Sequence, residues 1–441
     1  MSKRPYLLLG AFLAALAMWL WVQRIAIPRQ QTESAVQGIP RGNLSDLYPR
    51  WLGARELFFH GRDPYGAEIT REIQRGYYGR ALDASRPNDP RDQQAFAYPL
   101  YVVFVLAPTV GLPFALVQRI FLCFLVAFTA ASVLLWLHAL KWQLTLESKL
   151  IWMVLVLGSF PAIQGFKLQQ LTLLVAGLLA LSLAALTRGR FVWAGVAIAV
   201  ASIKPQLVFL LVLWLCLWVS GNWRQRKRLF WSMTLSASAL VVGAEILLPG
   251  WIREFRAASA AYYNYTGGGR SVLDVLLSPM VGRVVSALLV IALLIALWHW
   301  RRAAENSVEF QYSLVLVLAT TLAVIPMFAP YNQLLLIPVL MFMARAARDL
   351  WTKSRISRVL TAITVLSVFW PWIAAAGLVV ANFLLPRKTI LNAWAPPIYT
   401  SNYIPVTVLA LVWASRNVLL GQKELAGKAT PPTLRQGAKA E

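Results

Sequence analysis

Long apolar segments alternate with short polar stretches along the whole chain. The apolar segments recur at lengths of about 17–25 residues, which a helix needs to cross the hydrocarbon core of a bilayer. A transmembrane barrel would instead show alternating segments of about ten residues, and the sequence has no such pattern. No long polar linker divides the 441 residues. We predict an all-α polytopic membrane protein with one transmembrane domain over residues 1–421 and a basic, disordered cytoplasmic tail over residues 422–441.

Basic residues gather in the short polar stretches and set the predicted topology. The net charge of +24 could indicate nucleic-acid binding, but the positive-inside rule places such Lys and Arg clusters in cytoplasmic loops. Both ends of the chain are then cytoplasmic, so the number of crossings is even. The twelve predicted crossings are 6–24, 112–140, 149–164, 168–187, 191–203, 205–220, 228–249, 280–298, 310–327, 331–346, 356–384 and 403–420. The proline-rich segment 98–111 is predicted to be a broken interfacial or re-entrant segment.

Three connections on the predicted outer face are polar and unusually tight. They cover residues 163–170, 203–206 and 326–333. The predicted helices that flank the second one have about 13–16 residues, short of the roughly 20 needed to span a bilayer. Polar backbone at membrane depth is tolerated where it lines protein or a wet cavity. We therefore predict an outward-facing cavity lined by Lys167, Gln169, Gln170, Lys204, Gln206, Asn332 and Gln333, on the same side as a first outer loop over residues 28–96 and a second over 250–279.

Half of the acidic residues lie between the first two apolar segments. The chain has 18 acids, and nine are in this stretch: Glu33, Asp46, Glu56, Asp63, Glu68, Glu72, Asp83, Asp89 and Asp92. The same stretch holds ten arginines, at positions 29, 41, 50, 55, 62, 71, 75, 80, 86 and 91. We interpret most of the acids as the solvated face of an outer subdomain.

Asp46 and Asp63 border a predicted amphipathic helix in this loop. Apolar residues from Leu47 to Phe58 fall at helical spacing, which predicts a helix lying in the membrane interface. Asp46 stands at its start, where it is either an N-cap or a chemical carboxylate. Asp63 belongs to the sequence Asp-Pro-Tyr, which favours a turn.

The cationic candidates point to an anionic ligand. Lys204 lies between two short apolar helices without an obvious carboxylate partner, so it either binds an anion such as a phosphate or snorkels to the interface. Arg55 and Arg270 are further phosphate candidates on the same side. Three other outer acids stay open: Glu245 is functional or interfacial, and Glu254 and Asp274 assist or are solvated.

Cofactor motifs are absent from the sequence. His60, His138, His299 and the two cysteines have no metal-ligand spacing, and no P-loop or dinucleotide fingerprint occurs. Any activated donor on the outer face is therefore expected to be lipid-linked, with its tail in the bilayer and its phosphate in the cavity.

Five motifs, in order, resemble glycosyltransferase family 87. The first is Ser-Asp-Leu-Tyr-x-x-Trp-x-x-Ala-Arg followed by Gly-x-Asp-Pro-Tyr, over residues 45–65. Residues 96–100 are similar to F-x-Y-P-P, 169–174 to a G-Q-x-N-like turn, and 194–205 to an A-G … K-P element. Residues 330–338 resemble a late segment that carries a histidine in some members, and this chain lacks that histidine.

The resemblance implies a multi-pass GT-C enzyme of the inner (plasma) membrane. Such enzymes transfer a sugar, typically mannose, from a polyprenyl-phosphate donor at the periplasmic or extracellular face, here to a glycolipid or glycan acceptor and with inversion. It implies Asp46 as the general base and requires no metal or other cofactor. The phosphate-binding candidates are Lys204, Arg55 and Arg270, and the sugar- or acceptor-binding candidates are Tyr48, Tyr98, Gln170, Gln206, Asn332 and Gln333. A lipid transporter without chemistry and a non-catalytic partner of an envelope assembly are the alternatives.

Overall fold

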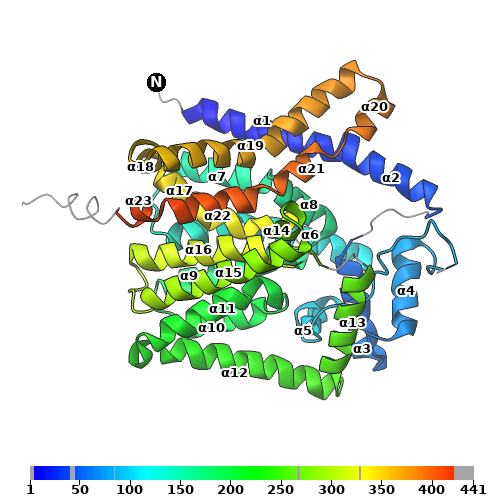
Figure 1. The fold of residues 1–441 in the computed structure, drawn as a ribbon. Coiled ribbons are helices and arrows are strands. Elements are labelled where there is room, and N and C mark those ends of the chain that lie inside the picture. Colours follow the sequence, from blue (N-terminus) through cyan, green and yellow to red (C-terminus); the bar gives the residue numbers. More distant parts are fainter. Residues whose placement is uncertain (1–3, 40–44, 84, 266–268, 327–328, 422–441) are drawn as a thin grey trace, which may run out of the picture.

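The computed structural model describes residues 4–39, 45–83, 85–265, 269–326 and 329–421. Within these ranges every regular element is a helix, which confirms the all-α prediction (Figure 1). The predicted tail over residues 422–441 lies outside the described residues.

Five of the described helices are long and apolar enough to cross a membrane. They are the continuous helix Tyr6–Val36, α6 (Phe114–Ala139), α12 (Trp223–Leu247), α15 (Pro279–His299) and α19 (Arg355–Leu384). A sixth candidate is the pair α7 (Leu146–Leu157) and α8 (Phe160–Leu168), which is bent by 56°. The protein is therefore a membrane protein by helix length and composition. The twelve predicted crossings are not confirmed, because several of them correspond to shorter helices.

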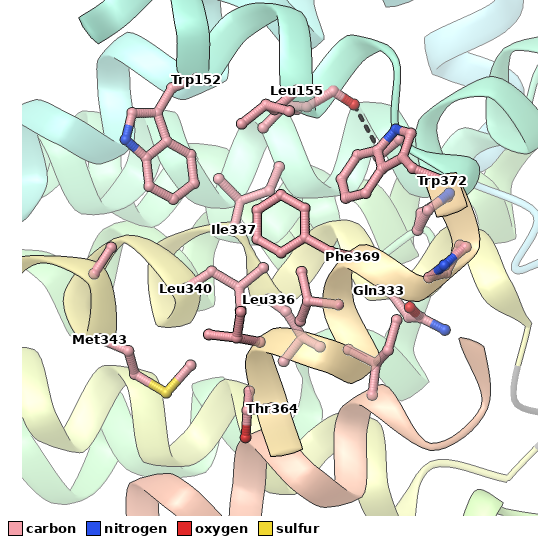
Figure 2. Close-up of a pocket in the computed structure, with 18 of the residues that line it drawn as sticks. Trp152, Leu155, Gln333, Leu336, Ile337, Leu340, Met343, Thr364, Phe369 and Trp372 are labelled. Atoms are coloured by element: carbon pink, nitrogen blue, oxygen red, sulfur yellow. Dashed lines mark hydrogen bonds between the residues drawn. The ribbon is translucent and has the colours of Figure 1, made fainter. Parts of the chain in front are cut away.

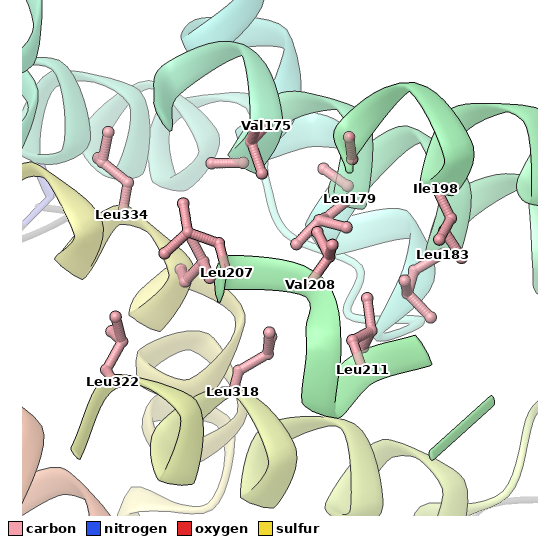
Figure 3. Close-up of a cluster of buried hydrophobic side chains, with 14 of the residues drawn as sticks. Val175, Leu179, Leu183, Ile198, Leu207, Val208, Leu211, Leu318, Leu322 and Leu334 are labelled. Carbon is pink, nitrogen blue, oxygen red and sulfur yellow. The ribbon is translucent and has the colours of Figure 1, made fainter. Parts of the chain in front are cut away.

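Short apolar helices fill the centre of the bundle. They are α9 (Leu171–Leu186), α10 (Phe191–Ala201), α11 (Pro205–Ser220) and α16 (Val308–Val324). Leucine, valine and isoleucine side chains from these four helices and from the 3₁₀ helix η3 (Pro330–Leu336) meet in one cluster, to which α10 contributes Ile198 (Figure 3). A helix that is apolar on all sides is stable when protein surrounds it. Burial at the core of the bundle thus explains why α9 is apolar on nearly all sides. α16 is buried over almost its whole length, with Glu309 and Gln311 near its start.

Gly195 shows how closely the central helices approach one another. A Cβ atom at this position of α10 would lie 2.7 Å from the backbone nitrogen of Met233 in α12. Only glycine allows this backbone contact, as small residues do at membrane helix interfaces.

Two segments differ from the predicted boundaries for local reasons. The first helix does not end near residue 24: α1 (Arg4–Trp21) continues through a π-helical turn (Val22–Ala26) into α2 (Ile27–Val36). Pro28 is the second residue of α2, but it lies inside the continuous helix and has no backbone N–H to donate to the preceding turn. The predicted crossing 331–346 is η3 followed by α17 (Ile337–Arg345), with Pro338 in the first turn of α17.

The remaining helices pack around the central helices. The predicted broken segment 98–111 contains α5 (Val102–Leu106) and a 3₁₀ turn (Ala107–Thr109). In Figure 1, α3 (Leu47–His60), α4 (Ala67–Tyr78), α5 and α13 (Trp251–Tyr265) lie together at one end. The other described helices are α14 (Val272–Leu276), α18 (Ala347–Thr352), α20 (Arg387–Asn392), α21 (Pro396–Ser401), α22 (Ile404–Ala414) and α23 (Arg416–Leu420).

Candidate active site

A polar cavity of about 350 Å³ lies between the segment over residues 46–99, three interhelical turns and α13. The turns join α8 to α9, α10 to α11, and α16 to η3. Six of the residues predicted from the sequence line this cavity: Asp46, Tyr98, Gln170, Lys204, Gln206 and Asn332. The structure therefore brings together side chains that are up to 286 positions apart in the chain, from Asp46 to Asn332 (332 − 46).

Main-chain contacts to the α8–α9 turn fix the position of Asp46. Its backbone N–H donates to the carbonyl of Leu168 at 2.9 Å, and the hydroxyl of Ser45 donates to the Gln169 side-chain carbonyl at 2.6 Å. Gln169 ends α8 in the left-handed conformation, with φ of 50°, and its amide group donates to the Gln118 carbonyl. The loop thus places Asp46 directly beside Gln170.

The Asp46 carboxylate is not an N-cap. Asp46 occupies the cap position of α3, but its side chain accepts no capping hydrogen bond. The Ser45 hydroxyl instead accepts the N–H of Leu47 at 3.2 Å. The carboxylate accepts a hydrogen bond from the Gln170 side-chain amide, so it faces the cavity instead of the helix end.

Lys204 lies at the centre of a chain of neutral hydrogen-bond partners. Its ammonium donates to Gln170 Oε1 at 2.9 Å and to Thr172 Oγ1 at 2.7 Å. The Thr172 hydroxyl in turn donates to Asn332 Oδ1 at 3.2 Å. Lys204 is 6% exposed, and its ammonium lies 5.6 Å and 5.2 Å from the ring centroids of Tyr98 and Tyr331.

These contacts argue against the interpretation of Lys204 as a snorkelling lysine. A snorkelling lysine reaches toward solvent, whereas this ammonium is buried among amide, hydroxyl and aromatic groups. No carboxylate lies within salt-bridge distance of it in the described ranges. Burial and the nearby Arg50 lower the pKa of Lys204 to about 7, while Asp46 acts in the opposite direction. An anion bound in the cavity would therefore stabilise the protonated lysine.

Arg50 and Asp92 also line the cavity, and the sequence analysis did not select them. Arg50 is 8% exposed; its guanidinium lies 4.6 Å from the centre of the Tyr98 ring and donates to the Asp46 carbonyl. Its Nε has no hydrogen-bond partner among the described residues. Asp92 accepts the backbone N–H and the side-chain amide of Gln94 at 3.0 Å and 2.8 Å.

Burial governs the electrostatics of the two cavity carboxylates. Burial raises the pKa of Asp46 above its ordinary value; Arg50 and Lys204 act in the opposite direction, and Asp92 adds to the rise. Burial likewise raises the pKa of Asp92. Burial also raises the pKa of Tyr98, to about 12. A carboxylate with a raised pKa is a stronger base than a solvated one, which suits proton abstraction.

Six predicted residues lie outside the lining of this cavity. Two of them are Lys167, whose ammonium donates to the Gln30 side chain, and Gln169, which binds Ser45 and the Gln118 carbonyl. Arg55 donates to the Val110 carbonyl at 3.4 Å and lies over the rings of Trp51 and Phe59. Tyr48 packs edge-on against Phe114. The remaining two are Gln333, whose amide donates to the Ser401 carbonyl at 2.9 Å, and Arg270, which is exposed.

Helical spacing explains why Arg50, and not Arg55, reaches the cavity. Arg50 is four residues after Asp46, so both project from the same side of the first turn of α3. Arg55 is five residues further along, which turns it about 140° around the helix. This i, i+4 relation was present in the sequence. Asp92 had no comparable signal, because an irregular segment brings it to the cavity.

The other outer carboxylates have local partners. Asp63 accepts the N–H of Tyr65 at 2.9 Å, which confirms the predicted turn. Glu245 accepts the N–H of Gly250 at 2.8 Å, after the end of α12. Glu254 pairs with Arg253 at 3.0 Å, and Asp274 forms a capping box with Ser271 at the start of α14. None of these four lines the cavity.

The helical fold and the polar cavity at one end of the bundle define a membrane protein with a site for polar or charged ligands. The sequence model of glycosyltransferase family 87 matches residues 96–328, which is more than half of the chain. The chain therefore belongs to glycosyltransferase family 87 and is a membrane glycosyltransferase. The match includes Tyr98, Gln170, Lys204 and Gln206 and begins after Asp46. No curated protein and no solved structure matches the chain.

Proposed function

We propose that the protein transfers a hexose, with mannose as the first candidate, from a polyprenyl-phosphate donor to a glycolipid or envelope glycan. One observation carries the proposal. The side-chain amide of Gln170 joins the Asp46 carboxylate to the Lys204 ammonium, donating to the first and accepting from the second. A base and a cation for the leaving phosphate are thus held one side chain apart in a single cavity.

The reaction is a direct displacement with inversion. Asp46 accepts the proton of an acceptor hydroxyl, and the hydroxyl oxygen forms a bond to the anomeric carbon of the sugar. The bond from that carbon to the phosphate oxygen breaks, and polyprenyl phosphate leaves with the electron pair. Lys204 stabilises the charge that develops on the phosphate.

Arg50 is the second phosphate ligand in this proposal. It replaces Arg55 and Arg270, which lie outside the cavity lining. The unpartnered Nε of Arg50 is a donor that an anion in the cavity can use. Gln206, Asn332 and Tyr98 remain the candidates for the hydroxyls of sugar and acceptor.

We further propose a GT-C-like bundle of twelve crossings, with the cavity on the periplasmic or extracellular side. The burial of α9 and α16 supports this, because helices surrounded by protein need not match the bilayer thickness. Arg345 and Arg348 lie at the junction of α17 and α18, at the end of α17 that is farther from η3. Basic residues there agree with a cytoplasmic location for that end.

The test uses purified protein in vesicles with a radiolabelled polyprenyl-phosphate mannose donor and a membrane glycolipid extract as acceptor. Wild type is expected to transfer the label, and Asp46→Asn is expected to bind donor without transfer. Asp63→Asn is the matched control, because Asp63 is in the same loop and serves a turn. Undiminished transfer by folded Asp46→Asn would remove Asp46 as the base. Movement of the lipid across the bilayer without sugar transfer would favour a transporter.

A further inference from the structure

Two hollows in the helical bundle differ in the charge of the side chains that line them. The first, of about 290 Å³, lies between η3, α7, α17, α19 and α22, and its described lining contains no charged side chain (Figure 2). The second is a groove of about 540 Å³ on α10 and α12, which we call the α10–α12 groove. Its lining includes Val192 and Val196 on α10 and Lys227, Arg228, Trp231 and Leu235 on α12. Of the two, the α10–α12 groove combines apolar contacts with positive charge.

The apolar part of the α10–α12 groove lies on the outside of the bundle. Val192, Trp231 and Leu235 are 52%, 51% and 64% exposed, and α12 is a candidate membrane span. The two helices meet closely beneath these side chains, because the Ser232 hydroxyl donates to the Val192 carbonyl at 2.7 Å. In a membrane, the groove is therefore open to lipid along its length.

Lys227 and Arg228 place two positive charges at one end of the groove. Both are exposed, and neither forms an ion pair or a hydrogen bond with another residue that the structure describes. The preceding Arg226 is different, because it is buried and donates to three main-chain carbonyls. Arg226 thus holds the fold together, whereas Lys227 and Arg228 are available to an anion.

An aromatic cluster adjoins the two charges. The ring centroids of Trp223, Phe230 and Trp231 are 5.3–6.4 Å apart. Tryptophan favours the level of the lipid headgroups, where its ring is in an apolar layer and its N–H is near polar groups. The positive-inside rule accounts for cations at a cytoplasmic helix end, but it does not require an apolar groove and a tryptophan beside them.

The groove has about the depth of one leaflet. Lys227 and Leu235 are eight positions apart on α12, which is about 12 Å at the helical rise. Half of the hydrocarbon core of a bilayer is about 15 Å thick. A lipid with its headgroup at the basic end would therefore lay the length of an acyl chain along the groove, whereas a polyprenyl chain would extend far beyond it.

The basic end of the groove is remote from the polar cavity. α11 begins next to Lys204, which lines the polar cavity, and it ends at Ser220, three residues before α12 begins. α12 then returns to α13, which also lines the polar cavity (Figure 1). A lipid headgroup at Lys227 thus belongs to the other leaflet from a ligand phosphate at Lys204.

We propose that the α10–α12 groove binds one anionic phospholipid, with its phosphate at Lys227 and Arg228 and an acyl chain along Trp231, Leu235 and Val196. Basic pockets between membrane helices recognise anionic headgroups in this way. A zwitterionic lipid fits the same groove but gains less from the two cations. The bound lipid contacts both helices and so stabilises their pairing. This site does not depend on which sugar or donor the enzyme uses.

Photolabelling of purified protein in phosphatidylcholine vesicles tests the site without any glycosyl transfer. Two probes carry a diazirine in an acyl chain, one on phosphatidylglycerol and the other on phosphatidylcholine. Each basic side chain near the membrane surface favours an anionic lipid by about fivefold, so we expect half-maximal labelling of α10 and α12 at a concentration at least tenfold lower for the phosphatidylglycerol probe. Equal labelling of wild type by the two probes would overturn the proposal.

A matched pair of double variants tests the role of the charges. Lys227→Gln/Arg228→Gln should abolish the preference for phosphatidylglycerol. Lys141→Gln/Arg302→Gln is the control, because it removes two exposed charges outside the groove lining and should keep the preference. Addition of phosphatidylglycerol should raise Tm in wild type and in the control only. Equal loss of the preference in both double variants would mean a general effect of charge and would refute the site.

A groove-filling variant and two competitors test the apolar part. Val196→Trp should lower labelling by both probes, whereas Leu288→Trp, on the exposed face of α15, should not. Displacement of the phosphatidylglycerol probe by glycerol phosphate would reduce the groove to a simple anion site. Displacement by polyprenyl phosphate at a lower concentration than by phosphatidylglycerol would assign it to a prenyl lipid. Either result would overturn the proposal, and both competitors act on wild type, so neither depends on a variant that folds.

Discussion

The loop over residues 28–96 contains two groups of carboxylates, which differ in the side chains that bind them. In the first, which we call the outer group, Arg62 pairs with Glu56 at 2.8 Å and with Glu72 at 2.7 Å, and Arg80 pairs with Asp89. In the cavity group, Asp46 and Asp92 accept hydrogen bonds from the neutral amides of Gln170 and Gln94. No salt bridge to either of them occurs among the described residues.

This difference indicates which carboxylates of the loop can act as a base. The hydrogen bond from Arg80 lowers the pKa of Asp89 to about 2, so that group is a weak base. Burial raises the pKa of Asp46, and its amide partner does not neutralise the charge. An ion pair therefore keeps an acid as a structural group, whereas an amide in a closed cavity orients it and leaves it basic.

The largest expected effect comes from Asp46→Asn. Loss of a positioned general base lowers kcat by about 10²–10⁴-fold. The folded state should keep its stability or gain some, because the change removes a buried charge that has no ion-pair partner. Steady-state kinetics and thermal unfolding of the same preparation measure both. Wild-type kcat in this variant would place Asp46 with the outer, structural group.

Lys204→Met should have the next largest effect. Removing one preorganised electrostatic contact costs about 10²–10³-fold in kcat, and the loss should appear with every acceptor. Lys204 also lowers the pKa of Asp46, so the acid limb of the pH–rate profile should move to higher pH. Gln206→Leu, in the same cavity but uncharged, is the control. A profile that stays in place would show that the two groups do not interact.

The pH–rate profile of Asp92→Asn distinguishes the carboxylates of the cavity group from those of the outer group. The rate of wild type should fall as the pH decreases through the raised pKa of Asp46, because only the carboxylate form accepts a proton. Asp92 adds to that rise, so Asp92→Asn should move the acid limb to lower pH. Asp89→Asn, an outer carboxylate, should leave it unchanged. If both variants move the limb equally, the distinction between the groups fails.

The smallest effect is expected for Arg62→Ala. This change removes the centre of the outer ion-pair cluster, which is partly solvated and screened by salt. Tm should fall slightly at low salt and less at high salt, and kcat/KM should be unchanged. A large loss of transfer would mean that the outer cluster positions the cavity.

Helix patterns were most predictive where local signals agreed. The predicted span 205–220 is that of α11, because Pro205 begins it and Gly221 follows its end. The hydrophobic pattern does not indicate the π turn at Val22–Ala26. The pattern therefore does not predict that the first helix extends to Val36. The count of twelve crossings stays a prediction, because buried short helices and exposed long ones have similar composition.

The order of the sequence motifs predicts part of the candidate site. Asp46, Gln170 and Lys204 lie in the motifs of the family resemblance, and the structure places all three on one cavity. The spacing of Arg50 and Arg55 from Asp46 along the helix could have favoured Arg50. The direction of Gln333 was not accessible, since it depends on where η3 packs. Asp92 reaches the cavity through an irregular turn in which Gln94 has φ of 52°, and such geometry has no periodic signal.

The hydrogen bond between Gln170 and Asp46 also determines when the candidate site can assemble during protein synthesis. Gln170 is 124 residues after Asp46. At about 5–20 residues per second, the ribosome adds that length in about 6–25 s. During that interval the loop has already left the ribosome, but its partners do not yet exist. The newly made enzyme is therefore inactive until its later helices insert, and a chain truncated before α8 carries an Asp46 without its partners Leu168 and Gln170.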